Sequence, residues 1–121
     1  MTEAHPAKVM VVEDEWLVAA VIVAALEDAA YEILGPVGRV EEALRLLAHE
    51  RPDAALLDIN LSGKRSFEIA DELRARAIPF AFMSGYAPTD LPPAYCGAPL
   101  VQKPVDPATL NLCVRALLRP H

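Results

Sequence analysis

The sequence predicts an α/β fold in which five short strands alternate with helices, in the order (βα)5. Short runs of apolar residues rich in Val, Ile and Leu recur along the chain and are typical of parallel strands covered on both faces. Longer stretches with apolar residues at helical spacing lie between them. Charged or hydroxyl side chains stand directly after several of the runs. These observations favour an open parallel sheet.

The first strand and the first helix have clear signals. Residues 8–12 (KVMVV) form a nearly continuous apolar run with β-branched side chains. The helix expected over 15–29 is rich in Ala and Leu and contains neither Gly nor Pro. It is apolar on almost every side, so we expect burial of more than one face. Within it, Trp16 is expected to be partly buried or to lie over a neighbouring site. A strand is also expected over 33–37, where a Gly-Pro pair interrupts the apolar run.

The next helix is expected over 40–50, where apolar residues recur at helical spacing. Pro52 ends that helix, and residues 54–57 form the third strand. Residues 60–64 are expected to be a loop, with Gly63 as its turn residue.

The second half of the chain repeats the pattern. Residues 66–76 are expected to form a helix, followed by strands over 79–83 and 100–102. The last helix runs to about residue 118 and begins with Asp106-Pro107, a typical N-cap and first-turn pair. The residues expected to face inward from the 66–76 helix and its end are Phe67, Ile69, Ala70, Leu73 and Ala77.

The fourth helix is expected to be irregular. The segment between the fourth and fifth strands contains Pro88, Pro92 and Pro93. Proline removes a backbone donor and disrupts the preceding helical turn. We therefore expect a loop with one short turn of helix there.

The composition fits a single domain over 1–121, with its core in 8–118. Hydrophobic residues make up 54% of the chain, which is enough to build a core. The formal net charge of −6 disfavours direct nucleic-acid binding, which depends on Lys and Arg neutralising phosphates.

Two further features bear on location. Residues 1–8 lack the apolar core of a secretion signal, and the longest apolar run, 16–26, is shorter than the ~20 residues that cross a bilayer. The two cysteines, Cys96 and Cys113, form no CxxC motif and are expected to be reduced thiols. We expect a cytoplasmic protein without membrane contact.

Five polar residues stand at or just beyond the ends of predicted strands. They are Glu13, Asp14, Asp58, Ser84 and Lys103. Side chains at the carboxyl ends of parallel strands converge in one crevice. Like charges about 4 Å apart repel by roughly 4 kcal/mol at an effective dielectric constant near 20, so gathered carboxylates favour a bound cation. Oxygen ligands suit Mg²⁺, which also accepts phosphate oxygens. Each residue alone has an ordinary structural explanation, and their joint placement is what predicts a phosphate-handling site.

Four motifs carry a family resemblance. They are VVEDE, LLDINLSG, FMSGY and VQKP, each at the end of a predicted strand and in this order. Over residues 8–118 the chain resembles the receiver domain of two-component response regulators. The resemblance implies a flavodoxin-like, doubly wound sheet with strand order 2-1-3-4-5. The run PFAFMSGY, and Leu100 where many receivers have an aromatic residue, resemble the FATGUY subgroup of stand-alone receivers, which have no output domain.

The resemblance implies a role for each acidic residue. Asp58 would be the phosphoacceptor and would form an acyl phosphate. Asp14 and Asp58 would bind Mg²⁺ directly, and Glu13 would bind it through water. Asn60 would contribute its backbone carbonyl to the metal.

The resemblance also implies roles for the remaining site residues. Ser84 would donate to a phosphoryl oxygen, and Lys103 would pair with Asp58 and then with the phosphoryl group. The Lys103–Pro104 peptide is expected to be cis. Because Leu100 cannot act as an aromatic switch, Ser84 and Tyr86 are the switch candidates.

The expected function is a Mg²⁺-dependent receiver without a separate turnover substrate. Its partners would be a sensor histidine kinase or a phosphotransfer protein and a downstream protein target, and the receiver would be a monomer or a weak homodimer. One alternative is a non-phosphorylated pseudo-receiver that acts as an interaction module. A Mg²⁺-dependent aspartyl-phosphate phosphatase would need an acid where this chain has Asn60. A flavin mononucleotide binder would need a phosphate loop where it has Glu13-Asp14-Glu15.

Overall fold

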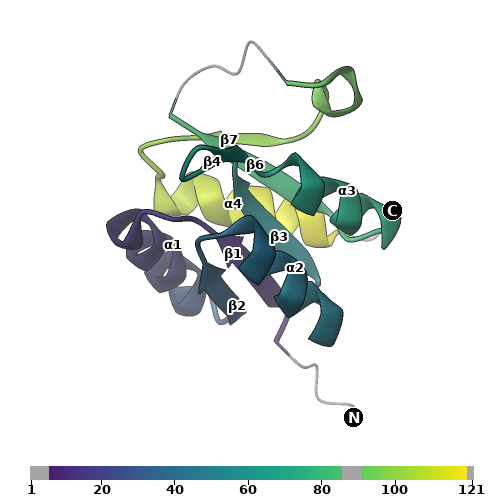
Figure 1. Cartoon of the computed structure of the whole chain (residues 1–121). Helices are drawn as coiled ribbons and strands as arrows, with labels where there is room; N and C mark the ends of the chain where they lie inside the picture. Colours follow the sequence, from purple (N-terminus) through teal and green to yellow (C-terminus); the bar gives the residue numbers. More distant parts are fainter. Residues whose placement is uncertain (1–5, 86–90, 120–121) are drawn as a thin grey trace.

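A five-stranded parallel sheet forms the centre of the molecule (Figure 1). The computed structural model of the protein describes residues 6–85 and 91–119. The strand order is β2-β1-β3-β6-β7, which confirms the expected α/β class and the flavodoxin-like order 2-1-3-4-5. The strands are β1 (Lys8–Val12), β2 (Glu32–Val37), β3 (Ala54–Asp58), β6 (Phe80–Ser84) and β7 (Leu100–Gln102).

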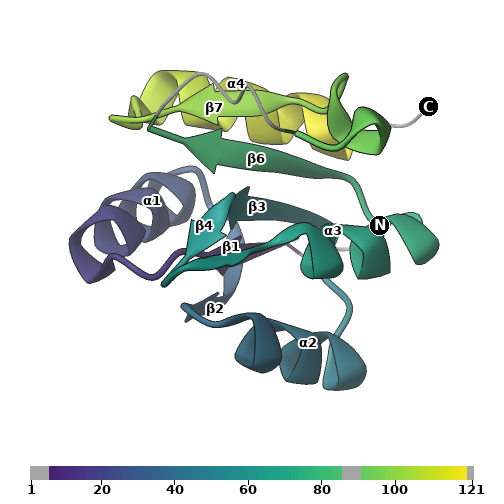
Figure 2. The same ribbon diagram turned by 45° about the horizontal axis from the view of Figure 1, so that its top comes forward.

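Helices cover both faces of the sheet, as Figure 2 shows from a second direction. The helices are α1 (Trp16–Asp28), α2 (Val40–His49), α3 (Phe67–Ala75) and α4 (Pro107–Leu118). Helices α1 and α4 contact each other on one face, and α2 and α3 contact each other on the opposite face. The Asp106 carboxylate accepts a hydrogen bond from Thr109 N at 3.0 Å, which confirms the expected N-cap of α4.

The two apolar cores lie on either side of the sheet. In β1, Met10 and Val12 belong to the core under α2 and α3, whereas Val9 and Val11 belong to the core under α1 and α4. All four side chains are fully buried. Burial on both faces explains why the strands read as continuous apolar runs rather than as alternating ones.

Strand β2 forms despite its Gly-Pro pair. Gly35 has a φ of 104°, and a side chain there would bring a Cβ within 2.9 Å of Val11 O, so only glycine fits. The register with β1 shifts between Met10 and Val12, next to this point. Glycine thus allows an interrupted sequence to remain a strand.

The expected loop over 60–64 is instead a small antiparallel hairpin. Strand β4 (Asn60–Leu61) pairs with β5 (Lys64–Arg65). Its turn residues, Ser62 and Gly63, have φ values of 50° and 88°. Strands of two residues carry no measurable periodicity, so the apolar pattern could not indicate them.

Helix α1 is buried on one side only, contrary to the expectation of wider burial. Ala19, Ile22, Ala25 and Leu26 face the core. The outer side exposes Trp16, Leu17 and Val21, with 76%, 62% and 49% of their surface accessible, so Trp16 is not partly buried as expected. The composition of a helix shows how apolar it is, but not how many of its faces pack against other elements.

The end of α3 also differs from expectation. Ile69, Ala70 and Leu73 are buried, but Ala77 is exposed. Helix α3 ends at Ala75, and Ala77 adopts a φ of 57° beyond that end. The inward helical spacing therefore stops before Ala77.

In the described part of the segment between β6 and β7 (residue 85 and residues 91–99), one short 3-10 turn is present, η1 (Pro93–Tyr95), as expected. Tyr95 is 3% exposed and belongs to the core under α2 and α3. Tyr86 lies outside the described residues.

Candidate functional site

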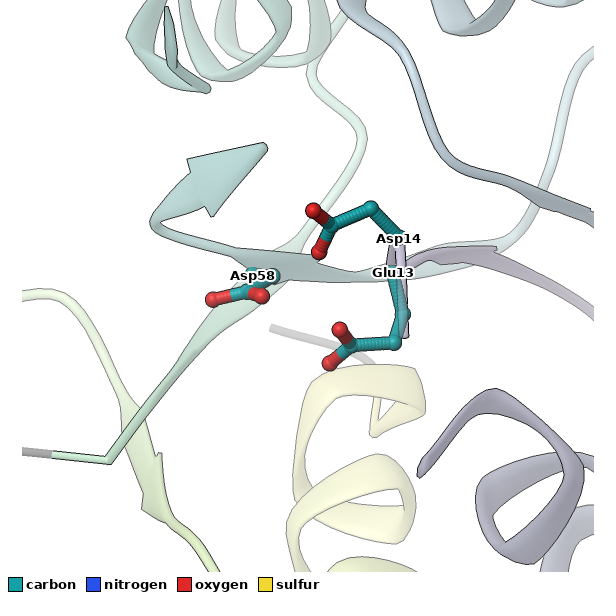
Figure 3. Close-up of side chains that lie close together, drawn as sticks. All are labelled: Glu13, Asp14 and Asp58. Carbon is teal, nitrogen blue, oxygen red and sulfur yellow. The ribbon is translucent and has the colours of Figure 1, made fainter. Parts of the chain in front are cut away.

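Three carboxylates gather at the carboxyl ends of β1 and β3. Glu13 and Asp14 directly follow β1, and Asp58 is the last residue of β3. One carboxylate oxygen from each residue lies within 4.8 Å of the others, and Figure 3 shows the three groups facing a common space. Glu13 and Asp58 are buried, whereas Asp14 is exposed. The expected convergence at the strand ends is therefore present.

Backbone contacts fix the position of Glu13. Its N–H donates to Val37 O at 2.9 Å, which ties it to the end of β2. Its side chain accepts a hydrogen bond from Glu15 N at 3.1 Å and points inward. The neighbouring Asp14 consequently points toward the open side of the site.

Two other segments of the chain contact Asp14. Ser62 N and Ser62 Oγ both donate to Asp14 Oδ2, each at 3.0 Å. On another side, a Cβ added to Gly38 would lie 3.1 Å from Asp14 Cα, so the close approach of that backbone depends on glycine. Sequence reasoning assigned no site role to Ser62 or Gly38.

Lys103 supplies the positive charge of the site. Its N–H donates to Ser84 O at 2.8 Å, which places it just beyond the end of β7. Its Nζ lies 2.7 Å from Glu13 Oε1 and 3.1 Å from Asp58 Oδ2. The Lys103–Pro104 peptide is cis, as expected. Lys103 thus bridges two of the three carboxylates.

The buried Glu13 and the half-buried Lys103 shift each other's pKa. Burial raises the pKa of Glu13 from 4.5 to about 7, and the hydrogen bond from Lys103 offsets only part of that effect. Burial alone would lower the pKa of Lys103, but the hydrogen bonds to Glu13 and Asp58 and the negative charges of both acids together outweigh burial and raise it. Lys103 is therefore cationic at neutral pH, while Glu13 is close to its midpoint.

The remaining predicted residues border the same space. Asn60 and Ser84 line a cleft of about 500 Å³ together with Asp14, Asp58 and Lys103. Asn60 N donates to Asp58 Oδ1 at 3.4 Å, and Ser84 ends β6 and pairs with Gln102 of β7. The predicted residues Asp14, Asp58, Asn60, Ser84 and Lys103 thus line this cleft, while the buried Glu13 lies behind it in contact with Lys103.

The donor set fits a magnesium ion. The carboxylates of Glu13, Asp14 and Asp58 offer hard oxygen ligands. The adjoining cleft has room for the water ligands that Mg²⁺ retains. A cation would also relieve the repulsion between the carboxylates, because Lys103 provides only one positive charge against them.

Comparison with known proteins identifies the family. The model of the response regulator receiver domain matches residues 9–115. The chain belongs to this family. It is therefore a receiver of the type used in two-component signalling, and its acidic cluster lies where the family's magnesium site is expected.

Curated relatives support the assignment. The receiver is 28% identical over 117 residues to the alkaline phosphatase synthesis transcriptional regulatory protein PhoP of Bacillus subtilis, covering 93% of this chain and 48% of PhoP. It is 28% identical over 89 residues to the transcriptional regulatory protein PdtaR of Mycobacterium tuberculosis, covering 73% and 43%. The chain thus spans less than half the length of these relatives.

Solved structures agree with the receiver fold. SdrG from Sphingomonas melonis matches with a TM-score of 0.84 and 32% identity, over 97% of this chain and 100% of SdrG. The response regulator PhyR from Brucella abortus matches with a TM-score of 0.82 and 29% identity, over 94% and 48%. Among the described residues of this receiver, no helix is long and apolar enough to cross a membrane.

Proposed function

We propose that the receiver accepts a phosphoryl group on Asp58 in a Mg²⁺-dependent reaction. The observation that carries the proposal is the placement of Asp58, with Oδ2 3.1 Å from Lys103 Nζ and an oxygen within 4.8 Å of Glu13 and Asp14 oxygens. A buried carboxylate beside an ammonium and further acids has the parts that phosphoryl transfer needs: a nucleophile, a cation site and a donor for developing charge.

The proposed donor is a phosphohistidine on a sensor kinase or a phosphotransfer protein. A carboxylate oxygen of Asp58 forms the new bond to phosphorus. The bond from phosphorus to the imidazole nitrogen breaks, and that nitrogen takes a proton from solvent. The product on the receiver is an acyl phosphate.

Each neighbouring residue has a proposed task. Asp14 and Asp58 hold Mg²⁺ directly, Glu13 holds it through water, and Asn60 contributes its backbone carbonyl. The bound metal offsets the charge that gathers between the carboxylate and phosphoryl oxygens. Lys103, already within reach of Asp58, pairs with a phosphoryl oxygen after transfer.

Ser84 donates to another phosphoryl oxygen in this proposal. It ends β6 beside the cleft that Asp58 and Lys103 also line. A move of Ser84 toward the phosphoryl group would also move Gly85 and the segment that follows. Ser84 and Tyr86 are therefore the proposed switch residues.

We also propose that signalling proceeds by protein contact or by onward phosphotransfer, as in a stand-alone FATGUY-type receiver. The match to SdrG over that whole chain supports the stand-alone assignment. The irregular segment around η1, and Leu100 in place of an aromatic residue, support the subgroup. The phosphatase alternative is disfavoured because Asn60 cannot act as the general acid.

Labelling with acetyl phosphate tests the acceptor. The wild-type receiver with Mg²⁺ should gain the mass of one phosphoryl group, and Asp58→Ala should gain none. Asp28→Ala, which alters an exposed aspartate at the end of α1, is the matched control and should label normally. Full labelling of Asp58→Ala would refute the acceptor assignment, and an unlabelled wild type would favour the pseudo-receiver.

A further inference from the structure

The hairpin of β4 and β5 brings its turn against Asp14. Ser62 N and Ser62 Oγ both donate to the same oxygen, Asp14 Oδ2, at 3.0 Å. Ser62 can aim both donors in one direction because its φ is 50°, a left-handed conformation that few residues other than glycine adopt. Within the described part of the chain, Asp14 Oδ1 accepts no hydrogen bond.

Several contacts hold the hairpin in place. Leu61 is 2% exposed and belongs to the core under α2 and α3. Lys64 Nζ forms an ion pair with Glu41 of α2. After the second strand, Ser66 N donates to Ile59 O at 2.9 Å and closes the base of the hairpin. The position of Ser62 is therefore set by the fold rather than by Asp14 alone.

Asp14 needs such support because its side chain is exposed. Glu13 and Asp58 are held by burial and by Lys103, whereas the neighbours that enclose Asp14 are Ser62 and the backbone of Gly38. An exposed carboxylate without fixed donors samples several rotamers. Ordering it when a metal binds would lower the affinity.

We propose that Ser62 is a positioning residue for the metal site: the hairpin tip holds Asp14 Oδ2, so that Oδ1 faces the cation. This inference rests on the Mg²⁺ site of the proposed function. Hydrogen-bond partners that orient a ligand affect metal affinity by about 10- to 100-fold in other sites. Because Asp14 is exposed and Ser62 N would remain, we expect the loss of Ser62 Oγ to lie at the lower end of that range.

Magnesium binding without a phosphodonor tests the inference. The single tryptophan, Trp16, lies two residues from Asp14 and reports binding by fluorescence, and calorimetry provides a second readout. Ser62→Ala and Ser62→Gly both keep the N–H and lose the hydroxyl, but they differ in the cost of a positive φ. Both variants should bind Mg²⁺ about tenfold more weakly than the wild type.

Ser66→Ala is the matched control. It also removes a serine hydroxyl near the hairpin, but Ser66 Oγ is buried and makes no hydrogen bond within the described residues. Its Mg²⁺ affinity should equal that of the wild type. Circular dichroism of each variant checks that the fold is retained.

The possible outcomes distinguish the positioning role of Ser62 from the existence of the Mg²⁺ site. Unchanged or tighter binding by Ser62→Ala would overturn the positioning role while leaving the metal site intact. Weak binding by Ser62→Ala with normal binding by Ser62→Gly would assign the effect to backbone strain and also overturn it. A wild type that binds no Mg²⁺ would refute the proposed metal site and this inference together.

Discussion

At the scale of single residues, Glu13 has an unusual position. It is a buried acid whose pKa is raised to about 7, yet it lies 2.7 Å from Lys103. Burial destabilises the ionised form of this carboxylate by more than the contact with the Lys103 ammonium stabilises it. Without a metal, the folded receiver therefore resists the ionisation of Glu13.

This resistance predicts a pH dependence of stability in EDTA. The Glu13 pKa is about 7 in the folded state and near 4.5 when unfolded, so the unfolded chain loses its proton first and stability falls as pH rises from 4.5 to 7. Glu13→Gln removes the ionisation. The variant should gain stability over wild type by up to about 3 kcal/mol above pH 7, and nothing from this source below pH 4.5.

Urea unfolding at several pH values measures the effect. Glu27→Gln, an exposed change near the end of α1, should show no such trend. A stability difference between Glu13→Gln and wild type that is constant from pH 5 to pH 8 would contradict the raised pKa.

Asp14 gives a second prediction at this scale. Asp14→Asn removes a charged oxygen ligand and should weaken Mg²⁺ binding at least tenfold, which corresponds to about 1.4 kcal/mol. The measurement is the change of Trp16 fluorescence with Mg²⁺, supported by calorimetry. Asp28→Asn serves as the control, and an unchanged binding curve for Asp14→Asn would count against its role.

At the scale of elements, Tyr95 fastens the segment before β7 to α3. Its ring stacks on Phe67 with centroids 6.0 Å apart, and the Arg74 guanidinium lies 4.3 Å from the ring centroid. Its hydroxyl donates to Asp71. Burial and the Asp71 carboxylate raise the pKa of Tyr95 to about 12, so the phenol keeps its proton. The Tyr95 side chain thus holds the turn η1 against α3.

Two substitutions separate the contribution of the Tyr95 ring to stability from that of its hydroxyl. Tyr95→Ala should destabilise the receiver by about 3–5 kcal/mol, because it empties an aromatic core position. Tyr95→Phe should cost less, about 1.5–3 kcal/mol, the value of a hydrogen bond to a charged group. Urea unfolding measures both, with Tyr31→Phe as the control. Equal losses in Tyr95→Ala and Tyr95→Phe would show that the ring contributes little.

The segment between β6 and β7 is also where we expect phosphorylation to change the structure most. We predict that phosphorylation changes residues 84–99 more than β7, because Leu100 has no ring to swing inward and Ser84 begins the segment. Amide exchange with and without beryllofluoride measures this, and Asp58→Ala should show no difference. Identical exchange of 84–99 in both states, with a change elsewhere, would contradict the prediction.

At the scale of the whole molecule, the topology explains what the sequence could predict. Asp14, Asp58 and Lys103 could be placed together because parallel strands end at the same edge. The role of Ser62 could not be foreseen, because it depends on a φ of 50° and on a contact across 48 positions. The exposed side of α1 could not be predicted, because apolar residues on that side suggested a covering layer. The described residues contain no such layer.

The order of the strands also determines how other chains can approach. The two edges of the sheet are β2 and β7 (Figure 1). Pro36 interrupts the row of amide donors on β2, and β7 has only three residues. Short or proline-containing edges disfavour the addition of a further strand from another molecule. This receiver is therefore protected against edge-to-edge aggregation, and its helices and strand-end cleft remain the surfaces open to specific partners.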